Sequence, residues 1–251
     1  MTVAGPEQDL APVLASVAGV EGWMTDAQAR RLWDGARRIA PGGQIVEIGS
    51  FRGRSTIILA KAAGEAVAVT AIDPHGGGDR GPNEISPDAG RGDADHETFH
   101  ANLGEAGVDE RVRHVRRPSG DALGEVRGEV DLLYIDGAHR YRFAKPDIEH
   151  WGARVAPGGS MLIHDAYSAV GVMLAQMRLL FAGHAFRYVG RSGSLVEYRR
   201  EDLDGRARIA NGLAQAAGLP YFARNCAVKL ALMARLRPLA RLLGEQGHWP
   251  Y

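Results

Sequence analysis

The sequence predicts an α/β protein built on a seven-stranded, mostly parallel sheet with helices on both faces. From residue 44 onward, short apolar runs alternate with segments of helical periodicity, which is the pattern of consecutive βαβ units. Acidic residues follow several of these runs, at the strand ends where open α/β sheets bind ligands. The chain of 251 residues is 45% hydrophobic and 24% charged, as ordinary globular proteins are.

Each element of this fold is predicted by its own stretch of sequence. The apolar runs predict strands at residues 44–49, 66–73, 111–117, 130–136, 160–165, 186–190 and 194–200. Helical periodicity predicts helices at 54–63, 95–106, 143–155 and 169–181, with a short turn after Asp121. The Gly- and Pro-rich residues 74–94 predict a long loop. Because closure over a bound acceptor excludes water from the reaction, we expect that loop to act as a lid.

Two segments flank the predicted core. We expect an N-terminal helical cap over residues 1–40, a ligand-binding core over 41–200 and a C-terminal helical tail over 201–251. Basic and apolar side chains interleave along the tail, which predicts amphipathic helices that pack on the core or form a homo-oligomer, most simply a dimer. Contact with a membrane surface or a polyanion through the basic side chains is the alternative.

The overall composition narrows the class of protein. A formal net charge of zero argues against a nucleic-acid partner. Cys226 is the single cysteine, so no intramolecular disulfide can form. The N-terminal residues do not have the pattern of a secretory signal, and no stretch reaches the roughly 18 apolar residues of a transmembrane segment. We therefore expect a cytoplasmic protein without a transmembrane segment.

The first predicted strand leads into the sequence EIGSFRGRST, residues 47–56, and this loop predicts a cofactor site. Gly49 and Gly53 let the main chain pass close to a ligand, and a helix N-terminus attracts a carboxylate or phosphate. Asp73 ends the second strand, where a carboxylate can accept the hydroxyls of a ribose. Together these features indicate a nucleoside-containing cofactor. The simpler alternative is that both glycines only serve the packing of strand against helix.

The spacing of the glycines separates the two cofactors that this pattern allows. A dinucleotide-binding loop reads G-x-G-x-x-G, whereas this loop has two glycines four residues apart with bulky side chains between them. The pattern E-x-G-x-x-x-G resembles motif I of the class I S-adenosylmethionine-dependent methyltransferases. This resemblance implies a Rossmann-like fold, and it implies that the cofactor is bound by Glu47, Gly49, Ser50, Gly53, Ser55, Asp73, Asp121 and Ala122. Asp121 can equally be a helix N-cap.

Acidic residues at the ends of the fourth and fifth strands predict a metal site. Asp136 and Asp165 end strands that neighbour each other in this topology, so their like charges need a proton or a cation between them. Carboxylates, water and a substrate hydroxyl suit Mg²⁺ or Mn²⁺. His139, with a reference pKa of about 6.5, can take a hydroxyl proton as a general base near neutral pH. A plain Asp-Gly turn at 136–137 is the alternative.

The turn DGAH at 136–139 and the sequence HDA at 164–166 resemble the metal-dependent sugar O-methyltransferases of macrolide biosynthesis. The resemblance covers about residues 20–200 and implies that Asp136 and Asp165 bind the metal and that His139 is the base. His164 stands where that family has a second acid. Either His164 binds a metal such as Mn²⁺, or it contacts the metal ligands without binding the metal itself. His75, just after Asp73, either reaches the substrate or caps the loop.

The resulting hypothesis is an S-adenosylmethionine-dependent O-methyltransferase, with Mg²⁺ or Mn²⁺, that methylates a hydroxyl of a small-molecule sugar or oligosaccharide. The composition also resembles, within the same broad group, the mycobacterial enzymes that 1-O-methylate methylmannose polysaccharides, which would make the acceptor a mannoside. A phenolic or other natural-product hydroxyl is an alternative acceptor. A cofactor-binding subunit without catalysis is a further alternative, disfavoured by the joint presence of Asp136, His139 and Asp165. An NAD(P)-dependent oxidoreductase is disfavoured by the missing third glycine.

Overall fold

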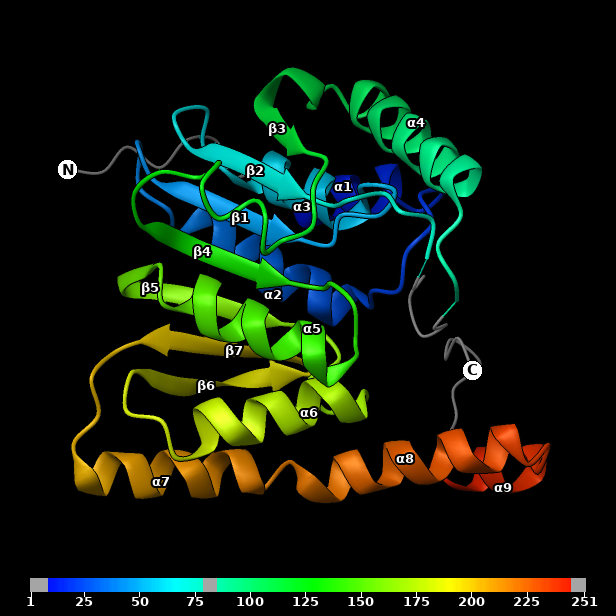
Figure 1. Ribbon diagram of the computed structural model, residues 1–251, viewed down its shortest axis with the longest axis vertical. Coiled ribbons are helices and arrows are strands. Elements are labelled where there is room, and N and C mark those ends of the chain that lie inside the picture. Colours follow the sequence, from blue (N-terminus) through cyan, green and yellow to red (C-terminus); the bar gives the residue numbers. More distant parts are fainter. Residues whose placement is uncertain (1–8, 79–84, 245–251) are drawn as a thin grey trace.

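A central sheet of seven strands organises the computed structural model, which describes residues 9–78 and 85–244 (Figure 1). The strand order is β3-β2-β1-β4-β5-β7-β6, and β7 alone runs antiparallel to its neighbours. The strands are β1 (Gln44–Ile48), β2 (Ala68–Ile72), β3 (Val112–Val115), β4 (Val130–Ile135), β5 (Val155–Ile163), β6 (Phe186–Ser192) and β7 (Leu195–Arg200). The mostly parallel, Rossmann-like sheet predicted from the sequence is confirmed.

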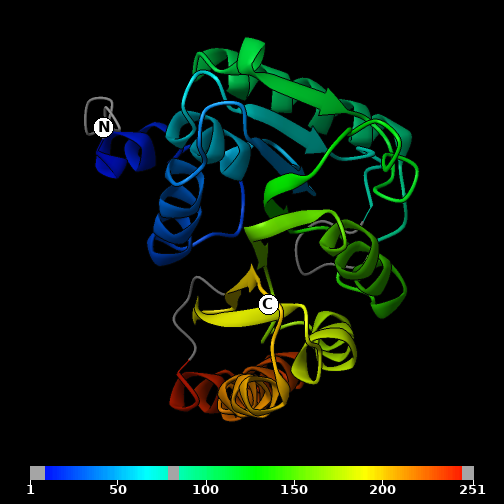
Figure 2. The ribbon, with the colours of Figure 1, turned by 90° about the vertical axis from the view of Figure 1, so that its left-hand side faces the viewer.

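Helices cover both faces of this sheet, as the alternating pattern predicts. One face is covered by α1 (Leu10–Ser16), α2 (Asp26–Arg37), α3 (Arg54–Ala62) and α4 (Ala89–Glu105). The other face is covered by α5 (Tyr141–Pro146) and α6 (Val170–Gln176), which continue as the π-helical turns η2 (Asp147–Trp151) and η3 (Met177–Phe181). Figure 2 shows α1 to α3 and α5 on opposite sides of the strands. A short 3₁₀ turn, η1 (Asp109–Arg111), leads into β3.

The strands are buried on both faces, which explains their nearly continuous apolar sequences. In β4, Leu132 and Tyr134 join the apolar cluster under α1 to α4, whereas Leu133 and Ile135 join the cluster under α5 and α6. All four side chains are at most 5% exposed. This two-sided burial holds the carboxyl end of β4 in place, and Asp136 follows directly.

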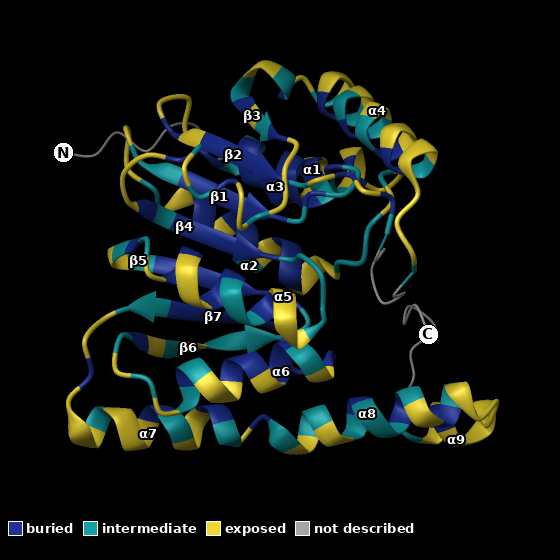
Figure 3. Cartoon of the chain, viewed as in Figure 1, coloured by how far each residue is buried: buried dark blue, intermediate teal, exposed yellow. Residues whose placement is uncertain are grey.

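The C-terminal tail forms α7 (Gly205–Ala216), α8 (Leu219–Met233) and α9 (Arg237–Leu242), a row of helices along the β6 edge of the sheet (Figures 1 and 3). Its inner side bonds to the turn after β5. Asn225 Nδ2 donates to the main-chain oxygen of Tyr167 at 2.8 Å, and Lys229 Nζ donates to that of Ser168 at 2.7 Å. The tail therefore packs on the core, and it does so against the turn that carries Asp165.

Several of the predicted boundaries are wrong. Helix α4 begins at Ala89 and not at residue 95, because Asp88 caps it through a hydrogen bond from the Arg91 amide to Asp88 Oδ1. The segment predicted as a helix over 143–155 begins at Tyr141 and its π-helical turn ends at Trp151, and β5 starts at Val155. The predicted loop at 74–94 is therefore shorter, and its residues 79–84 lie outside the described residues.

Within the described residues, no helix combines the length and the apolar character needed to cross a membrane. The proposed division into cap, core and tail remains a prediction. The structure does place the N-terminal helices in one apolar cluster with the sheet, since Leu10 and Leu32 share that cluster with Ile45.

Candidate functional site

Four side chains at the carboxyl ends of β4 and β5 form what we call the acid–histidine cluster: Asp136, His139, His164 and Asp165. His139 Nε2 lies 3.0 Å from Asp165 Oδ2. His164 Nδ1 lies 3.1 Å from Asp136 Oδ1 and 3.4 Å from Asp165 Oδ2. The structure thus brings together the residues that the sequence analysis assigned to the metal and to the base.

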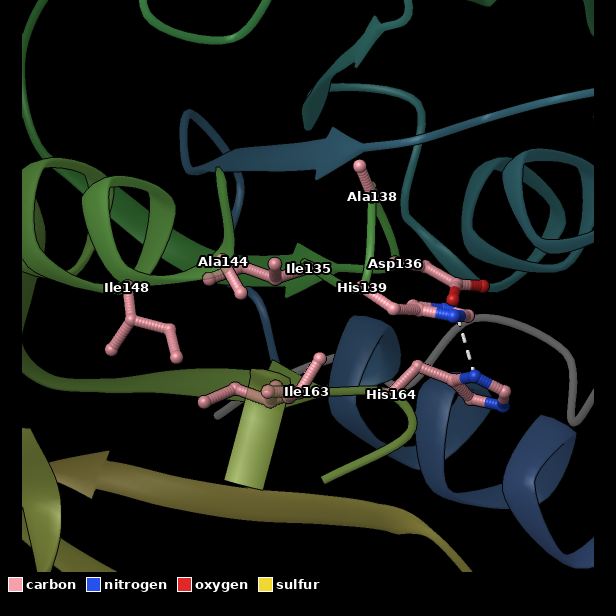
Figure 4. Close-up of a pocket in the computed structure, with 10 residues that line it drawn as sticks. Ile135, Asp136, Ala138, His139, Ala144, Ile148, Ile163 and His164 are labelled. Carbon is pink, nitrogen blue, oxygen red and sulfur yellow. Dashed lines mark ion pairs between the residues drawn. The ribbon is translucent and has the colours of Figure 1, made fainter. Parts of the chain in front are cut away.

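The local backbone explains why these residues meet. The register of β4 with β5 places Ile135 opposite Ile163, so the residues that follow the two strands lie side by side. Asp165 has a φ of 53°, a left-handed conformation that Asp tolerates better than most residues. Figure 4 shows Asp136, His139 and His164 at one end of a small pocket whose apolar end is formed by Ile135, Ala144, Ile148 and Ile163.

Charge coupling controls protonation in the acid–histidine cluster. Burial alone would lower the pKa of His164, but the charges of Asp136 and Asp165 outweigh it and hold that pKa well above its ordinary value. The pKa of His139 is likewise raised, because Asp165 outweighs the effect of burial. Burial would raise the pKa of Asp165, yet the two imidazoles hold it well below its usual range. Each group therefore depends on the others for its charge.

Hydrogen bonds from two residues that the sequence analysis missed hold the carboxylates in place. The Tyr134 hydroxyl donates to Asp136 Oδ2 at 2.8 Å, and the Ser168 hydroxyl donates to Asp165 Oδ1. Both lie at positions that the sequence makes available, since i and i+2 share a face of a strand and a serine three residues on can close a turn. Asn225 and Lys229, far away in the sequence, gave no such signal.

The donor set fits a divalent cation. One ligand atom each from Asp136, His139 and Asp165 lies within 4.8 Å of the other two. The two ring nitrogens of His164, which is only 6% exposed, make no hydrogen bond within the described residues, and its contacts with Asp136 and Asp165 lack hydrogen-bond geometry. Buried polar atoms without partners are uncommon, and a bound cation would pair with one of the two nitrogens of a neutral His164. Carboxylates mixed with imidazole suit Mn²⁺ better than Mg²⁺.

The glycine-rich loop after β1 lies directly against this cluster. Gly49 has a φ of 84°, and a Cβ at this position would lie 2.3 Å from the main-chain oxygen of Asp136. A Cβ on Gly53, which has a φ of 89°, would lie 2.6 Å from Leu103 of α4. Both glycines are thus required for packing, and Gly49 brings the loop next to the turn that carries Asp136 and His139.

Asp73 fastens the same loop to the end of β2. Its Oδ2 accepts hydrogen bonds from the amides of Ser50 and Phe51 at 3.0 and 2.9 Å, and its Oδ1 accepts one from the amide of His75 at 2.7 Å. Ser50 is 3% exposed, and its hydroxyl oxygen has no hydrogen-bond partner in the described chain. A polar ligand could hydrogen-bond to the unpaired Ser50 hydroxyl and to the partly exposed carboxylate of Asp73. These residues therefore fit a nucleoside-containing cofactor.

Glu47 lies beneath this loop and is completely buried. The hydroxyls of Ser55 and Thr56, in the first turn of α3, donate to its two carboxylate oxygens. Burial raises the pKa of Glu47 to about 8, with smaller contributions from the charges of Asp136 and Asp73. In this structure Glu47 and Ser55 contact each other, so they support the loop from below.

The remaining predicted residues lie around this site. Asp121 is exposed on the turn after β3, while the side chain of Ala122 is buried in the core. That turn is held by Ser119, whose hydroxyl donates to Asp147 and whose main-chain oxygen accepts from the Trp151 indole at 3.2 Å. The His75 side chain is 1% exposed, and its Nε2 lies 2.7 Å from the main-chain oxygen of Phe51.

Comparison with known proteins identifies the domain. Residues 46–166, from β1 to the turn after β5, match the family described as "Methyltransferase domain". They form a class I S-adenosylmethionine-dependent methyltransferase domain. The methyltransferase prediction is therefore confirmed, and the domain contains the glycine-rich loop after β1, where we predicted the cofactor (the cofactor loop below), together with Asp73 and the acid–histidine cluster.

Solved structures similar to the methyltransferase domain and its flanking helices agree on the fold. The cofactor-bound protein Rv0187 from MTB is 20% identical with a TM-score of 0.55, over 81% of this chain and 94% of that one. An O-methyltransferase from Bacillus cereus in complex with SAH is 18% identical with a TM-score of 0.55, over 79% and 94%. A methyltransferase from Geobacter sulfurreducens is 21% identical with a TM-score of 0.54, over 79% and 91%.

Among curated proteins, an uncharacterised protein of Sinorhizobium fredii is 37% identical over 54 residues. These residues are 21% of this chain and 6% of that protein, so the chain spans a small part of the relative that it matches.

Proposed function

We propose that this methyltransferase domain transfers a methyl group to a hydroxyl oxygen of a sugar or oligosaccharide, such as a mannoside, with the help of a divalent cation. The observation that carries the proposal is the meeting of Asp136, His139 and Asp165, whose ligand atoms lie within 4.8 Å of one another beside the cofactor loop. A protein that only binds the cofactor has no need of this arrangement. The Bacillus cereus neighbour, an O-methyltransferase by name, supports oxygen as the acceptor atom.

His139 is the proposed base. Its ring is 14% exposed, so it can reach an acceptor, and Asp165 orients it through a contact of 3.0 Å. The same carboxylate raises the pKa of His139, which favours the protonated ring over the neutral ring that a base requires. Asp136, Asp165 and His164 would hold Mg²⁺ or Mn²⁺, which when bound supplies positive charge that offsets the carboxylates and lowers the pKa of a bound hydroxyl. Neutral His139 then takes the hydroxyl proton.

An alcohol acceptor matches this equipment better than a phenol does. A phenolic hydroxyl has a pKa of about 10. A hydroxyl that is not attached to an aromatic ring is a much weaker acid, and water, the simplest example, has a pKa of about 15.7. The weaker acid needs both a base and a cation to lose its proton near neutral pH. The acid–histidine cluster provides residues for both, which favours a sugar hydroxyl.

The remaining residues of the site hold the cofactor in this proposal. Asp73 would accept hydrogen bonds from the ribose, Ser50 would bond through its unpaired hydroxyl, and the turn at Asp121 and Ala122 would line the adenine. Gly49 and Gly53 would let the main chain approach the methionine end, with Glu47 and Ser55 supporting the loop. His75 would position the loop through its contact with the main-chain oxygen of Phe51, because its buried side chain does not face the solvent.

The proposal is tested by a screen of mono- and oligosaccharides with radiolabelled S-adenosylmethionine, with and without Mg²⁺ or Mn²⁺, and with a catechol arm. We expect label in a saccharide, and we expect exhaustive dialysis against EDTA to remove the activity until the metal is restored. Label in the catechol alone would show that the acceptor is a phenol and not a sugar. Tight binding of S-adenosylhomocysteine without turnover of any acceptor would favour a non-catalytic subunit. Unchanged rates after EDTA would contradict a role for the metal in the reaction.

We also propose that the protein forms a homodimer through its tail. Large apolar side chains on α7, α8 and α9 face the solvent, among them Ile209, Leu213, Leu230, Met233 and Leu242, each at least 65% exposed. Exposed apolar groups gathered on one row of helices are typical of a subunit contact. Light scattering coupled to size exclusion tests this, and a monomer at high protein concentration would contradict it.

A further inference from the structure

Three histidines far from the acid–histidine cluster form a second group, which we call the histidine cluster: His96, His100 and His114. His96 and His100 are one turn apart on α4, and His114 lies on β3. One ring nitrogen from each lies within 4.8 Å of the other two. The ring centroids are 4.8 Å apart between His96 and His100 and 5.1 Å apart between His96 and His114.

Hydrogen bonds to groups outside the cluster involve the rings of His100 and His114, and they leave His114 Nε2 unpaired. His100 Nδ1 lies 2.9 Å from Asp109 Oδ1. The His114 ring is hydrogen-bonded by the main chain of Asp73, while its Nε2 is buried without a partner in the described chain. A histidine that binds a metal commonly donates its other ring N–H to a carboxylate or a main-chain carbonyl. Both His100 and His114 have that partner.

A neighbouring histidine shows the same deficit. The side chain of His75 is 1% exposed, and its ring packs against His114 with centroids 5.0 Å apart. Its Nδ1 is buried without a hydrogen-bond partner among the described residues. Two unpaired ring nitrogens in one buried spot are unusual, because nearly all buried polar atoms in folded proteins have a partner. An electron-pair acceptor bound to His114 Nε2 would resolve one of these two deficits.

Two of the three rings, those of His96 and His114, have lowered pKa values. Burial lowers the pKa of His114 to about 3, with further contributions from the nearby histidines. Burial and the charge of Arg116 also lower the pKa of His96. These lowered pKa values favour the neutral forms of His96 and His114, whose electron pairs a cation can accept.

We propose that His96, His100 and His114 bind a divalent transition metal ion, for which Zn²⁺ is the best match. Three imidazoles without a carboxylate suit zinc and neighbouring transition ions and are a poor site for Mg²⁺ or Ca²⁺. Tetrahedral zinc, with Zn–N bonds of about 2.0 to 2.1 Å, leaves a fourth position for water. Closing the three nitrogens around the ion requires side-chain movements of about 1 Å each, which the partly exposed rings allow.

This site is separate from the acid–histidine cluster. Strand β3 is one of the two edge strands, and β2 and β1 lie between it and β4. At about 4.8 Å per strand, the two groups are separated by roughly 14 Å of sheet. The metal would join α4 to β3 and hold the segment from Asp73 to His75, which in turn positions the loop at Phe51. Its role is thus to stabilise the cofactor side of the domain, and the site exists whether or not the acceptor is a sugar.

The test is the metal stoichiometry of the full chain. After dialysis against EDTA, the wild-type protein is loaded with Zn²⁺ and, separately, with Co²⁺, and bound metal is counted by mass spectrometry. We compare the double variant His100→Gln/His114→Gln with the control His150→Gln, an exposed histidine on the other face of the sheet. We expect the double variant to bind one equivalent fewer than the wild type, and the control to bind the same number as the wild type.

Two further measurements keep the result unambiguous. Bound Co²⁺ should show the intense visible absorption of a tetrahedral site in the wild type and lose it in the double variant. The variant Asp136→Asn/Asp165→Asn should keep that absorption, which separates this site from the proposed catalytic one. Circular dichroism and binding of S-adenosylhomocysteine confirm that the variants fold. Equal metal counts in the wild type and a folded double variant, or no bound metal in the wild type, would overturn the proposal.

Discussion

In the acid–histidine cluster two carboxylates surround two imidazoles, whereas in the histidine cluster three imidazoles lie together and one carboxylate, Asp109, contacts them from outside. The consequences for the same side chain are opposite. The pKa of His164 is held well above its ordinary value against the effect of burial, and the pKa of His114 falls to about 3 because of burial. Without a bound cation, the first setting favours a charged ring, and the second favours a neutral one.

The difference shows that burial alone does not decide what a histidine can do. Burial favours the neutral ring in both places, and a carboxylate within about 3 to 4 Å reverses the outcome. A charged imidazole can pair with acids or return a proton, whereas a neutral one can bind a transition metal directly. The two groups thus offer different chemistry on one sheet, and each of the following changes tests one side of that contrast.

The largest expected effect is on catalysis. His139→Ala should lower turnover by about 10² to 10⁴-fold, the usual contribution of a general base, and should change the affinity for S-adenosylhomocysteine by less than about twofold. The measurement is the initial rate with the best acceptor of the screen, together with a calorimetric titration. His150→Ala, an exposed histidine outside both clusters, is the control. Full activity in His139→Ala would remove this residue from the mechanism.

Glu47 isolates the effect of burial, since its main perturbation is desolvation. Its pKa of about 8 in the folded protein lies above the unfolded value of 4.5, so the folded state binds the proton more tightly. The stability that this provides is fully present below pH 4.5 and is lost as the pH rises through about 8, by at most about 5 kcal/mol. Urea denaturation of wild type and Glu47→Gln at pH 5 and pH 8 should show a smaller decrease in the variant. Parallel curves would mean that Glu47 keeps an ordinary pKa.

The contact between the cofactor loop and the acid–histidine cluster can be broken at Gly49. Gly49 and Gly42 have nearly the same φ, 84° and 85°. A Cβ on Gly49 would lie 2.3 Å from the main-chain oxygen of Asp136, whereas a Cβ on Gly42 would have no atom within 4 Å. Gly42→Ala should cost about 1 kcal/mol of unfolding free energy from backbone strain alone. Gly49→Ala should cost about 3 kcal/mol or more, because overlap is added. Equal costs by urea denaturation would contradict the close approach.

Much of the fold could be predicted from the sequence, because apolar periodicity and strand-end acids are local signals. The seven strands, the cofactor loop and the pairing of Asp136 with Asp165 all follow from such signals and from the known order of parallel sheets. Helix α4 was predicted too short, since its capping residue Asp88 lies in a stretch rich in Gly and Pro.

The contacts that depend on distant residues could not be predicted. The bonds from Asn225 and Lys229 to the turn at 167–168 join segments about 60 residues apart. The histidine cluster needed the packing of α4 on β3, which no spacing rule provides: His96 and His100 suggest one helix face, but His114 becomes a neighbour only in the folded sheet. Sequence thus predicts sites built at strand ends more readily than sites built between a helix and an edge strand.

The charge coupling in the acid–histidine cluster is tested by Asp165→Asn in the metal-free protein. Asn has nearly the same shape and tolerates the left-handed φ of 53° at this position. Removing the charge should lower the pKa of His139, because the adjacent opposite charge that raises it is lost, and should leave that of His114 unchanged. NMR titration of the ring protons measures both. A shift at His114 of the same size would mean that the two clusters are not electrostatically separate.

The smallest expected effect concerns the partner of His100. Asp109→Asn keeps a hydrogen-bond acceptor at 2.9 Å from His100 Nδ1 but removes its charge, so the ring becomes a weaker electron-pair donor. Loss of such an outer partner typically costs 10- to 100-fold in metal affinity, and this conservative change should cost about 10-fold. Competition with a zinc indicator gives the affinity, and Glu105→Gln, exposed at the end of α4, controls for the change in net charge. Equal losses in both variants would assign the effect to long-range charge. A loss confined to Asp109→Asn would show that this carboxylate orients His100 for the metal from outside the site. The carboxylates of the acid–histidine cluster differ in this respect, because they are themselves proposed ligands of the ion.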